Sequence, residues 1–164
     1  MKKPKWVVVF VVAMLTLAAV AVQAEAPKAE AVQADWQKIL KEYDTVREAL
    51  SRDDGAAAQK AAKTAEAGLV GLRGDAATVK ALQSAAGRVA STPDLKLSRM
   101  AFGEWSRGLI TLVAAQPEAQ RGVLCYQCTM TKTYQKWLQL SEPLANPYWG
   151  SQMLRCGSKV AIAP

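Results

Sequence analysis

The residues best suited to chemistry carry sulfur and lie in the last quarter of the 164-residue chain. One residue separates Cys128 from Met130, and two residues separate Met153 from Cys156. Two thiols and two thioethers form a soft ligand set, which prefers Cu(I) or Ag(I) to zinc, magnesium or calcium. An extended segment points Cys128 and Met130 to the same side. A helical turn places Met153 and Cys156 on one face. The pattern predicts a soft-metal site if the tail folds back on itself.

A disulfide between Cys128 and Cys156 is the alternative prediction. It would close a loop of about 29 residues and contribute on the order of 3 to 4 kcal/mol to stability by restricting the unfolded chain. The two methionines would then fill gaps in the core. Metal binding and oxidation exclude each other, because a metal ion needs free thiolates. Cys125 is an odd thiol, which stays unpaired, pairs between chains or serves as a substitute metal ligand.

The chain contains no histidine, and that absence excludes several classes of enzyme and metal site. Ser-His-Asp and Cys-His catalysis, His-ligated zinc and haem, and histidine pH switches all require this residue. Cys125 and Cys128 have C-x-x-C spacing, but a thioredoxin-like pair needs an α/β context and a zinc site needs a second ligand pair. The carboxylates are scattered and suggest no general acid and base. We therefore expect a protein that is not an enzyme.

The N-terminus has the layout of a secretory signal peptide. Three lysines among the first five residues precede an uncharged apolar stretch over 6–22, and small residues at 22 and 24 mark a cleavage site before Glu25. We assign residues 1–24 to the signal, with an uncleaved membrane anchor as the alternative. The rest of the chain is then expected to be periplasmic or secreted, where disulfides persist. The leading prediction of function is an exported helical domain that binds or passes on a soft metal ion such as Cu(I). The alternative is a structural or interaction module of the cell envelope that is stabilised by the disulfide and binds no metal.

The charge of the chain indicates no partner by itself. The 21 basic and 14 acidic residues give a net charge of +7, and removal of the signal lowers it to +4. The basic residues of the tail lack a nucleic-acid motif and fit a solvated surface. We expect no nucleic-acid partner and, once the signal is cleaved, no membrane partner.

Four short motifs in the tail resemble one family of exported domains. They are Cys128-x-Met130, Trp137-Leu138, Asn146-Pro147-Tyr148-x-Gly150 and Met153-Leu154-x-Cys156-Gly157. The family has no assigned function and also occurs at the C-terminus of some periplasmic adaptor subunits of heavy-metal efflux pumps. The chain departs from its pattern at Thr129, where the family has proline, at Trp149, where it has phenylalanine, and at the extra thiol of Cys125. The resemblance implies an association with heavy-metal handling, with efflux components or another envelope protein as partners, and it supplies no reaction.

Hydrophobic periodicity predicts four amphipathic helices before the tail. The first is expected to begin at an Asp35 cap and to end near Ser51, before a break at Asp53-Asp54-Gly55. The second is expected from about Ala57 to Arg73-Gly74, and the third from an Asp75 cap to about Ser91. The fourth is expected to run to Gln116-Pro117, with Thr92 as its cap and Pro93 in its first position. Their short connections favour an antiparallel up-and-down arrangement.

The expected fold class is all-α, with a four-helix bundle over 35–117 and an irregular tail over 118–164 in the same domain. Residues 25–34 are expected to form a flexible leader. The alanine faces of the two middle helices are expected to meet the aromatic side chains of the outer helices. Trp137, Tyr148 and Trp149 are expected to anchor the tail, and an aromatic platform for a ligand is the alternative.

Overall fold

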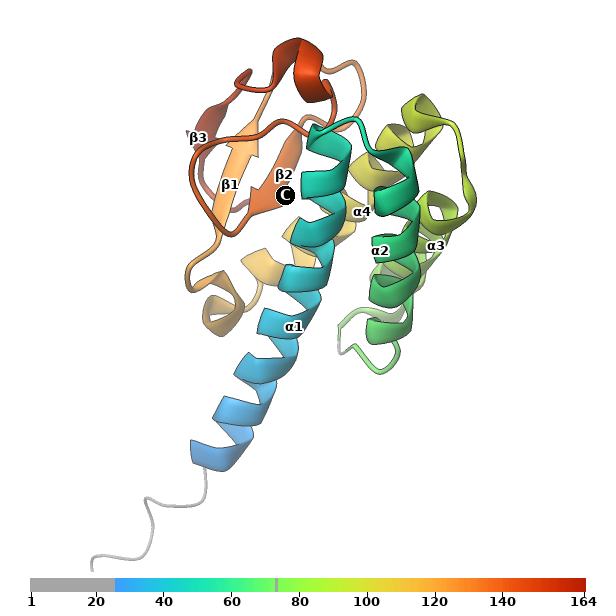
Figure 1. The fold of residues 1–164 in the computed structure, drawn as a ribbon. Coiled ribbons are helices and arrows are strands. Elements are labelled where there is room, and N and C mark those ends of the chain that lie inside the picture. The colour runs from blue at the N-terminus through green and yellow to red at the C-terminus, as the bar shows by residue number, and fades with distance from the viewer. Residues whose placement is uncertain (1–25, 73) are drawn as a thin grey trace, which may run out of the picture.

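The computed structural model describes residues 26–72 and 74–164, and the predicted signal peptide lies outside them. The larger part of the described chain forms four helices: α1 (Ala26–Ser51), α2 (Gly55–Gly68), α3 (Ala76–Ser91) and α4 (Leu95–Ala114) (Figure 1). Each helix packs mainly against the next one along the sequence, and α1 has few direct contacts with α4. No helix in the described part of the chain is long and apolar enough to cross a membrane. The prediction of a mainly helical fold is confirmed.

Small and large side chains fill different parts of the core. Ala58, Ala62 and Ala65 are buried at intervals of three or four residues, which places them on one face of α2 and lets its neighbours approach closely. Between α1 and α4 the rings of Tyr43 and Phe102 stack, with their centroids 4.8 Å apart. The alanine face and the aromatic faces that the sequence predicts are therefore both buried.

The first helix begins nine residues before its predicted start. Residues 25–34 were expected to form a flexible leader, but the chain is helical from Ala26 onward. This segment lacks apolar periodicity, and periodicity was the signal that predicted the helix. It is rich in alanine, glutamate and other strong helix formers, and Pro27 lies in the first turn, where a missing N–H costs no helical hydrogen bond.

Aspartate side chains cap the other three helices. The carboxylates of Asp54, Asp75 and Asp94 each accept a hydrogen bond from the backbone N–H three residues ahead, at 2.8 to 2.9 Å. The fourth helix therefore begins at Leu95, and the prediction of a Thr92 cap with Pro93 in the first position is wrong. Thr92 instead ends α3.

The C-terminal region folds as a small antiparallel sheet, so the all-α prediction is wrong there. The strands are β1 (Leu124–Gln127), β2 (Lys136–Gln139) and β3 (Ser158–Val160), in the order β2-β1-β3. Tyr126 lies directly opposite Trp137, and Cys125 lies opposite Leu138. The sheet packs on the helices through β2, which contacts α4 and α1. Strands of three or four residues are too short to produce a clear two-residue alternation.

Residues 140–157, here called the return segment, lead from β2 to β3 (Figure 1). They include the 3-10 turn η2 (Gly150–Met153), and a second 3-10 turn, η1 (Pro117–Gln120), connects α4 to β1. Tyr148 joins the return segment to both layers, because its ring lies 5.8 Å from that of Trp137 and 6.1 Å from that of Phe102 between centroids. Of the three predicted aromatic anchors, Trp137 and Tyr148 are buried in the core and Trp149 is only partly buried against it.

The cap of the fourth helix can be tested by two substitutions. We expect Asp94→Ala to lower the free energy of unfolding by about 1 kcal/mol, because the N–H of Leu97 loses its acceptor. Thr92→Ala should cost less, since the Thr92 side chain does not cap the helix. Urea unfolding monitored by circular dichroism measures both values, and a larger loss for Thr92→Ala would contradict this assignment.

Candidate thiol site

Cys128 and Cys156 come together although they are far apart in the sequence. Their Sγ atoms lie 2.6 Å apart. This separation is longer than a disulfide bond of about 2.05 Å, yet it is much shorter than the contact distance between unbonded heavy atoms. The backbone therefore presents the two side chains to each other as a pair that can form a covalent bond.

Cys128 is buried and immediately follows the last residue of β1. Its backbone N–H donates to the carbonyl of Gln135 at 3.0 Å, and its own carbonyl accepts from Thr131 at 3.3 Å. The chain turns at residues 129–130, so the extended arrangement of Cys128 and Met130 predicted from the sequence is wrong. Met130 is 58% exposed. The turn thus leaves this predicted metal ligand facing solvent over most of its surface.

Cys156 lies in the turn that follows η2. Its backbone N–H donates to the carbonyl of Met153 at 2.9 Å, so the predicted helical turn between these two residues is present. Its own carbonyl accepts a hydrogen bond from the side-chain amide of Asn146 at 2.8 Å. Hydrogen bonds to both its backbone N–H and its carbonyl therefore fix the position of Cys156, while its side chain is only partly buried.

Asn146 organises the return segment around this contact. Its side chain is fully buried, and its Oδ1 atom accepts from the backbone N–H groups of Tyr148, at 2.8 Å, and Trp149, at 3.2 Å. Its backbone N–H donates to the carbonyl of Leu154 at 2.8 Å. An asparagine that binds the N–H two residues ahead forms an Asx turn. The sequence analysis identified Asn146 only as part of a family motif and did not predict that its amide would hold the backbone of Cys156.

A second set of polar contacts fastens this turn to the helices. Arg99 of α4 donates from Nε to the carbonyl of Pro147 at 2.9 Å and from Nη2 to the carbonyl of Leu50 at 2.8 Å. The same Nη2 pairs with Asp53, whose other carboxylate oxygen accepts from the N–H of Ser151 at 3.0 Å. The hydrogen bonds from Ser151 and then Arg99 lower the pKa of Asp53. Sequence analysis identified Asp53 only as part of a helix break, and it missed Arg99.

Glycine is required where the return segment enters β3. Gly157 has φ of 147°, and an added Cβ atom would lie 2.9 Å from the ring of Trp137 and 3.1 Å from the carbonyl oxygen of Gln127. A larger residue would therefore displace the segment that carries Cys156.

Cys125 behaves as a core residue. It is buried within β1, and burial raises the pKa of its thiol to about 11. A buried thiol with a raised pKa is a poor nucleophile. Of the three roles left open for this odd thiol, its burial favours the unpaired one. The thiol that lies close to Cys128 is that of Cys156, so the C-x-x-C spacing of Cys125 and Cys128 does not indicate which two cysteines meet.

The two thiols would have to move apart before both could bind one metal ion. Metal–sulfur bonds are about 2.3 Å long, so two sulfur ligands of one ion stand well apart, whereas these thiols are 2.6 Å apart. The hydrogen bond with Cys128, followed by burial, raises the pKa of Cys156 to about 11, which opposes the thiolate that a metal ion needs. The metal site of Cys128, Met130, Met153 and Cys156 therefore stays a prediction.

Comparison of the chain with protein-family models, curated proteins and solved structures finds no match. The family resemblance of the tail motifs therefore stays a prediction.

The contacts of Asp53 predict a specific dependence of stability on pH. A carboxylate whose pKa is lowered by folding stabilises the fold above its unfolded pKa, and this contribution is lost as the pH falls through the folded value. At neutral pH we expect Asp53→Asn to cost about 0.5 to 1 kcal/mol, because the hydrogen bonds to Arg99 and Ser151 lose their charged acceptor on a partly exposed side chain. The difference in the free energy of unfolding between this variant and the unsubstituted protein should shrink in acid. Urea unfolding across a pH series measures it, with Asp35→Asn on the exposed surface as the control. A constant difference at all pH values would contradict the role of the charge.

Proposed function

We propose that the chain is an exported antiparallel helical bundle that serves as a non-enzymatic interaction module of the cell envelope. In this proposal a disulfide between Cys128 and Cys156 fixes the return segment on the sheet. The approach of the two Sγ atoms to 2.6 Å is the observation that carries the proposal. The signal-like N-terminus supports it, because disulfides persist outside the cytoplasm.

The pattern of burial favours a structural role for the bridge. Cys128 belongs to a buried strand end, and Cys156 belongs to a turn that Asn146 has already ordered. The bridge joins two segments whose other contacts already hold them at this spacing, so it stabilises the fold mainly by restricting the unfolded chain. Cys128 belongs to the same hydrophobic cluster as the buried aromatic rings of Tyr126, Trp137 and Tyr148, which are typical of a packed core.

The disulfide can be tested on protein isolated from the periplasm without reductant. We expect mass mapping to find Cys128 linked to Cys156, with Cys125 as a free thiol. Reduction should lower the free energy of unfolding by about 3 to 4 kcal/mol. Reductant should have no such effect on the Cys128→Ala or Cys156→Ala variant, and Cys125→Ala should respond as the unsubstituted protein does. Two free thiols at 128 and 156 in the native material would contradict the proposal.

Binding of a soft metal ion by the reduced protein is the second candidate function. It is favoured because two thiols from distant segments meet and one of them, Cys156, is partly exposed. The sulfur atoms would have to move apart to accept an ion, and the turn that carries Cys156 is the more exposed of the two segments. Such a site would suit Cu(I) or Ag(I), and the family resemblance would make heavy-metal efflux components its partners.

Competition with a chromogenic Cu(I) chelator tests this second candidate. Each thiol that becomes a thiolate ligand must release its proton, so with Cys128 and Cys156 both bound the apparent affinity should rise by up to about a hundredfold per pH unit through the neutral range. Cys128→Ser and Cys156→Ser should each abolish binding, whereas Cys125→Ser should not. If Met130→Ala and Met153→Ala also leave binding unchanged, the two thiols alone hold the ion. Absence of Cu(I) binding by the reduced protein would remove this candidate and leave the disulfide proposal intact.

A further inference from the structure

The strand β3 forms one edge of the C-terminal sheet. In the order β2-β1-β3 it pairs with β1 alone, and β1 is the element on which it packs. Ser158 and Lys159 are exposed, and Val160 is half-buried. The edge of a sheet carries main-chain N–H and carbonyl groups that can pair with a further strand. The two edges of this sheet differ in what binds these outward groups.

Main-chain hydrogen bonds alternate in direction along an antiparallel ladder. The N–H of Cys128 donates to the carbonyl of Gln135 at 3.0 Å, just beyond the paired residues of β1 and β2. Two residues earlier along β1, Tyr126 therefore also directs its N–H and carbonyl to β2. The N–H of Leu138 points away from β1, since it donates to the Tyr43 hydroxyl at 3.3 Å. Both hydrogen bonds give the same alternation.

This alternation assigns the outward groups of β3. Lys159 lies opposite Tyr126, whose main-chain groups are directed to β2. Lys159 therefore points its own N–H and carbonyl away from β1, while Ser158 and Val160 direct theirs toward it. Within residues 26–72 and 74–164, no other main-chain group binds the N–H or the carbonyl of Lys159. The outer side of β3 thus has a donor and an acceptor ready to pair.

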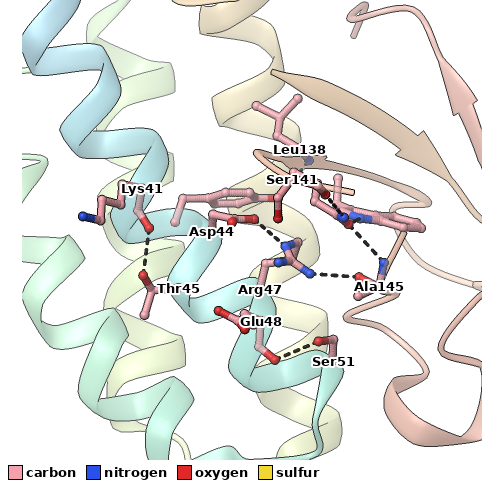
Figure 2. Close-up of polar contacts among 12 residues, drawn as sticks. Lys41, Asp44, Thr45, Arg47, Glu48, Ser51, Leu138, Ser141 and Ala145 are labelled. Atoms are coloured by element: carbon pink, nitrogen blue, oxygen red, sulfur yellow. Dashed lines mark hydrogen bonds and ion pairs between the residues drawn. The ribbon is translucent and has the colours of Figure 1, made fainter. Parts of the chain in front are cut away.

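The outer edge of β2 is closed by neighbouring elements. The carbonyl of Lys136 accepts from the Tyr148 hydroxyl at 2.6 Å, and the N–H of Leu138 is bound as described above. The return segment that follows β2 is joined to α1, where Arg47 donates to the carbonyl of Ala145 at 3.2 Å (Figure 2). In the described part of the chain, β3 is therefore the open edge of the sheet.

Contacts on both sides of β3 hold this edge in place. Before the strand, the side chain of Asn146 holds the carbonyl of Cys156 at 2.8 Å. After it, the Nζ atom of Lys136 donates to the carbonyls of Ala163, at 2.7 Å, and Pro164, at 3.1 Å. The edge is thus extended before any partner arrives, and preorganisation of this kind lowers the cost of binding.

The charge near the open edge is mainly positive. Residues 122–164 contain four basic residues and one acidic residue. Lys159 takes part in none of the ion pairs among the described residues. Directly opposite it on an added strand, a carboxylate would be favourable and a second lysine unfavourable. A second copy of this chain could pair with the whole of β3 only by placing Lys159 opposite Lys159, so a different chain is the better occupant.

We propose that the open edge of β3 binds an extended segment of a partner protein, which adds to the sheet as an antiparallel fourth strand and carries a carboxylate opposite Lys159. The inference rests on the function proposed above, because it names the surface and the kind of partner of the interaction module. Main-chain hydrogen bonds to Lys159 provide affinity, and alternate side chains of the added strand provide specificity. The residues on either side of the carboxylate lie on the same face as Val160 and should be apolar.

Binding of labelled, capped peptides to the oxidised mature protein, measured by fluorescence anisotropy at low ionic strength, tests this proposal. The reference peptide has a central glutamate between two valines and a threonine at each end. Methylation of the glutamate main-chain nitrogen removes a donor that faces Lys159 and should weaken binding at least about tenfold. Methylation of the next valine nitrogen, which faces away from β3, should change binding less than about twofold. Equal effects of the two methylations, or no saturable binding of the reference peptide at millimolar concentration, would overturn the proposal.

A charge swap tests the register. Lys159→Glu should weaken the reference peptide by about fivefold or more, and a peptide with lysine in place of the central glutamate should restore binding. Lys63→Glu, an equal charge change on the exposed surface of α2, should alter binding less than about twofold. Equal effects of the two variants would overturn the proposal. Dimerisation of the protein alone that the peptide reverses would also overturn it, because the occupant would then be a second copy.

Disulfide mapping is independent of these binding results. Strand addition can therefore fail while the proposed bridge stands, and the reverse outcome is equally distinguishable.

Discussion

The buried side chain of Asn146 satisfies three backbone groups at once: the N–H groups of Tyr148 and Trp149 and the carbonyl of Cys156. A buried amide without these partners would be costly, so the return segment must fold so that all three groups reach it. Because one of them belongs to Cys156, the folding of the turn also sets the distance between the two thiols. The arrangement of the candidate site is therefore a consequence of hydrogen bonding by a side chain that is not itself reactive.

The helices supply the surface on which this turn can form. Arg99 holds the carbonyls of Leu50 and Pro147 and the carboxylate of Asp53, so one guanidinium joins the end of α1, the following loop and the return segment. Tyr43 makes a similar connection nearer the centre, where its hydroxyl group lies 2.6 Å from Ser106 Oγ and accepts from the N–H of Leu138 at 3.3 Å. The sheet is thus attached to α1 and α4 by polar groups within an aromatic core, which specifies its position better than apolar contact alone.

The sequence predicted the parts of this fold that depend on local chemistry. The end of the first helix at Ser51, the buried alanine face of α2 and the cap at Asp75 follow from periodicity and from aspartate acting on its own neighbours. The sequence left two outcomes open for Cys128 and Cys156, a disulfide and a shared metal ion, because it provides only their residue types and the expected compartment. The strands were not predicted, because three or four residues are too few to show an alternation of apolar and polar side chains. Arg99 and Asp53 were missed because their contacts span more than 40 residues, and a single sequence carries no signal for such a pair.

The spacing of the thiol pair follows from the backbone that carries it. Asn146 binds the return segment on both sides of Arg155, through the carbonyls of Leu154 and Cys156, and so fixes the position of Cys156. A disulfide would bring the two sulfur atoms slightly closer than their present 2.6 Å, a change that small rotations of the side chains can supply. A metal ion bound by both sulfur atoms would require them to stand farther apart. The two candidate roles of the thiols therefore make opposite demands on this contact, and the backbone contacts of Asn146 hold Cys156 at a position that suits the bridged form.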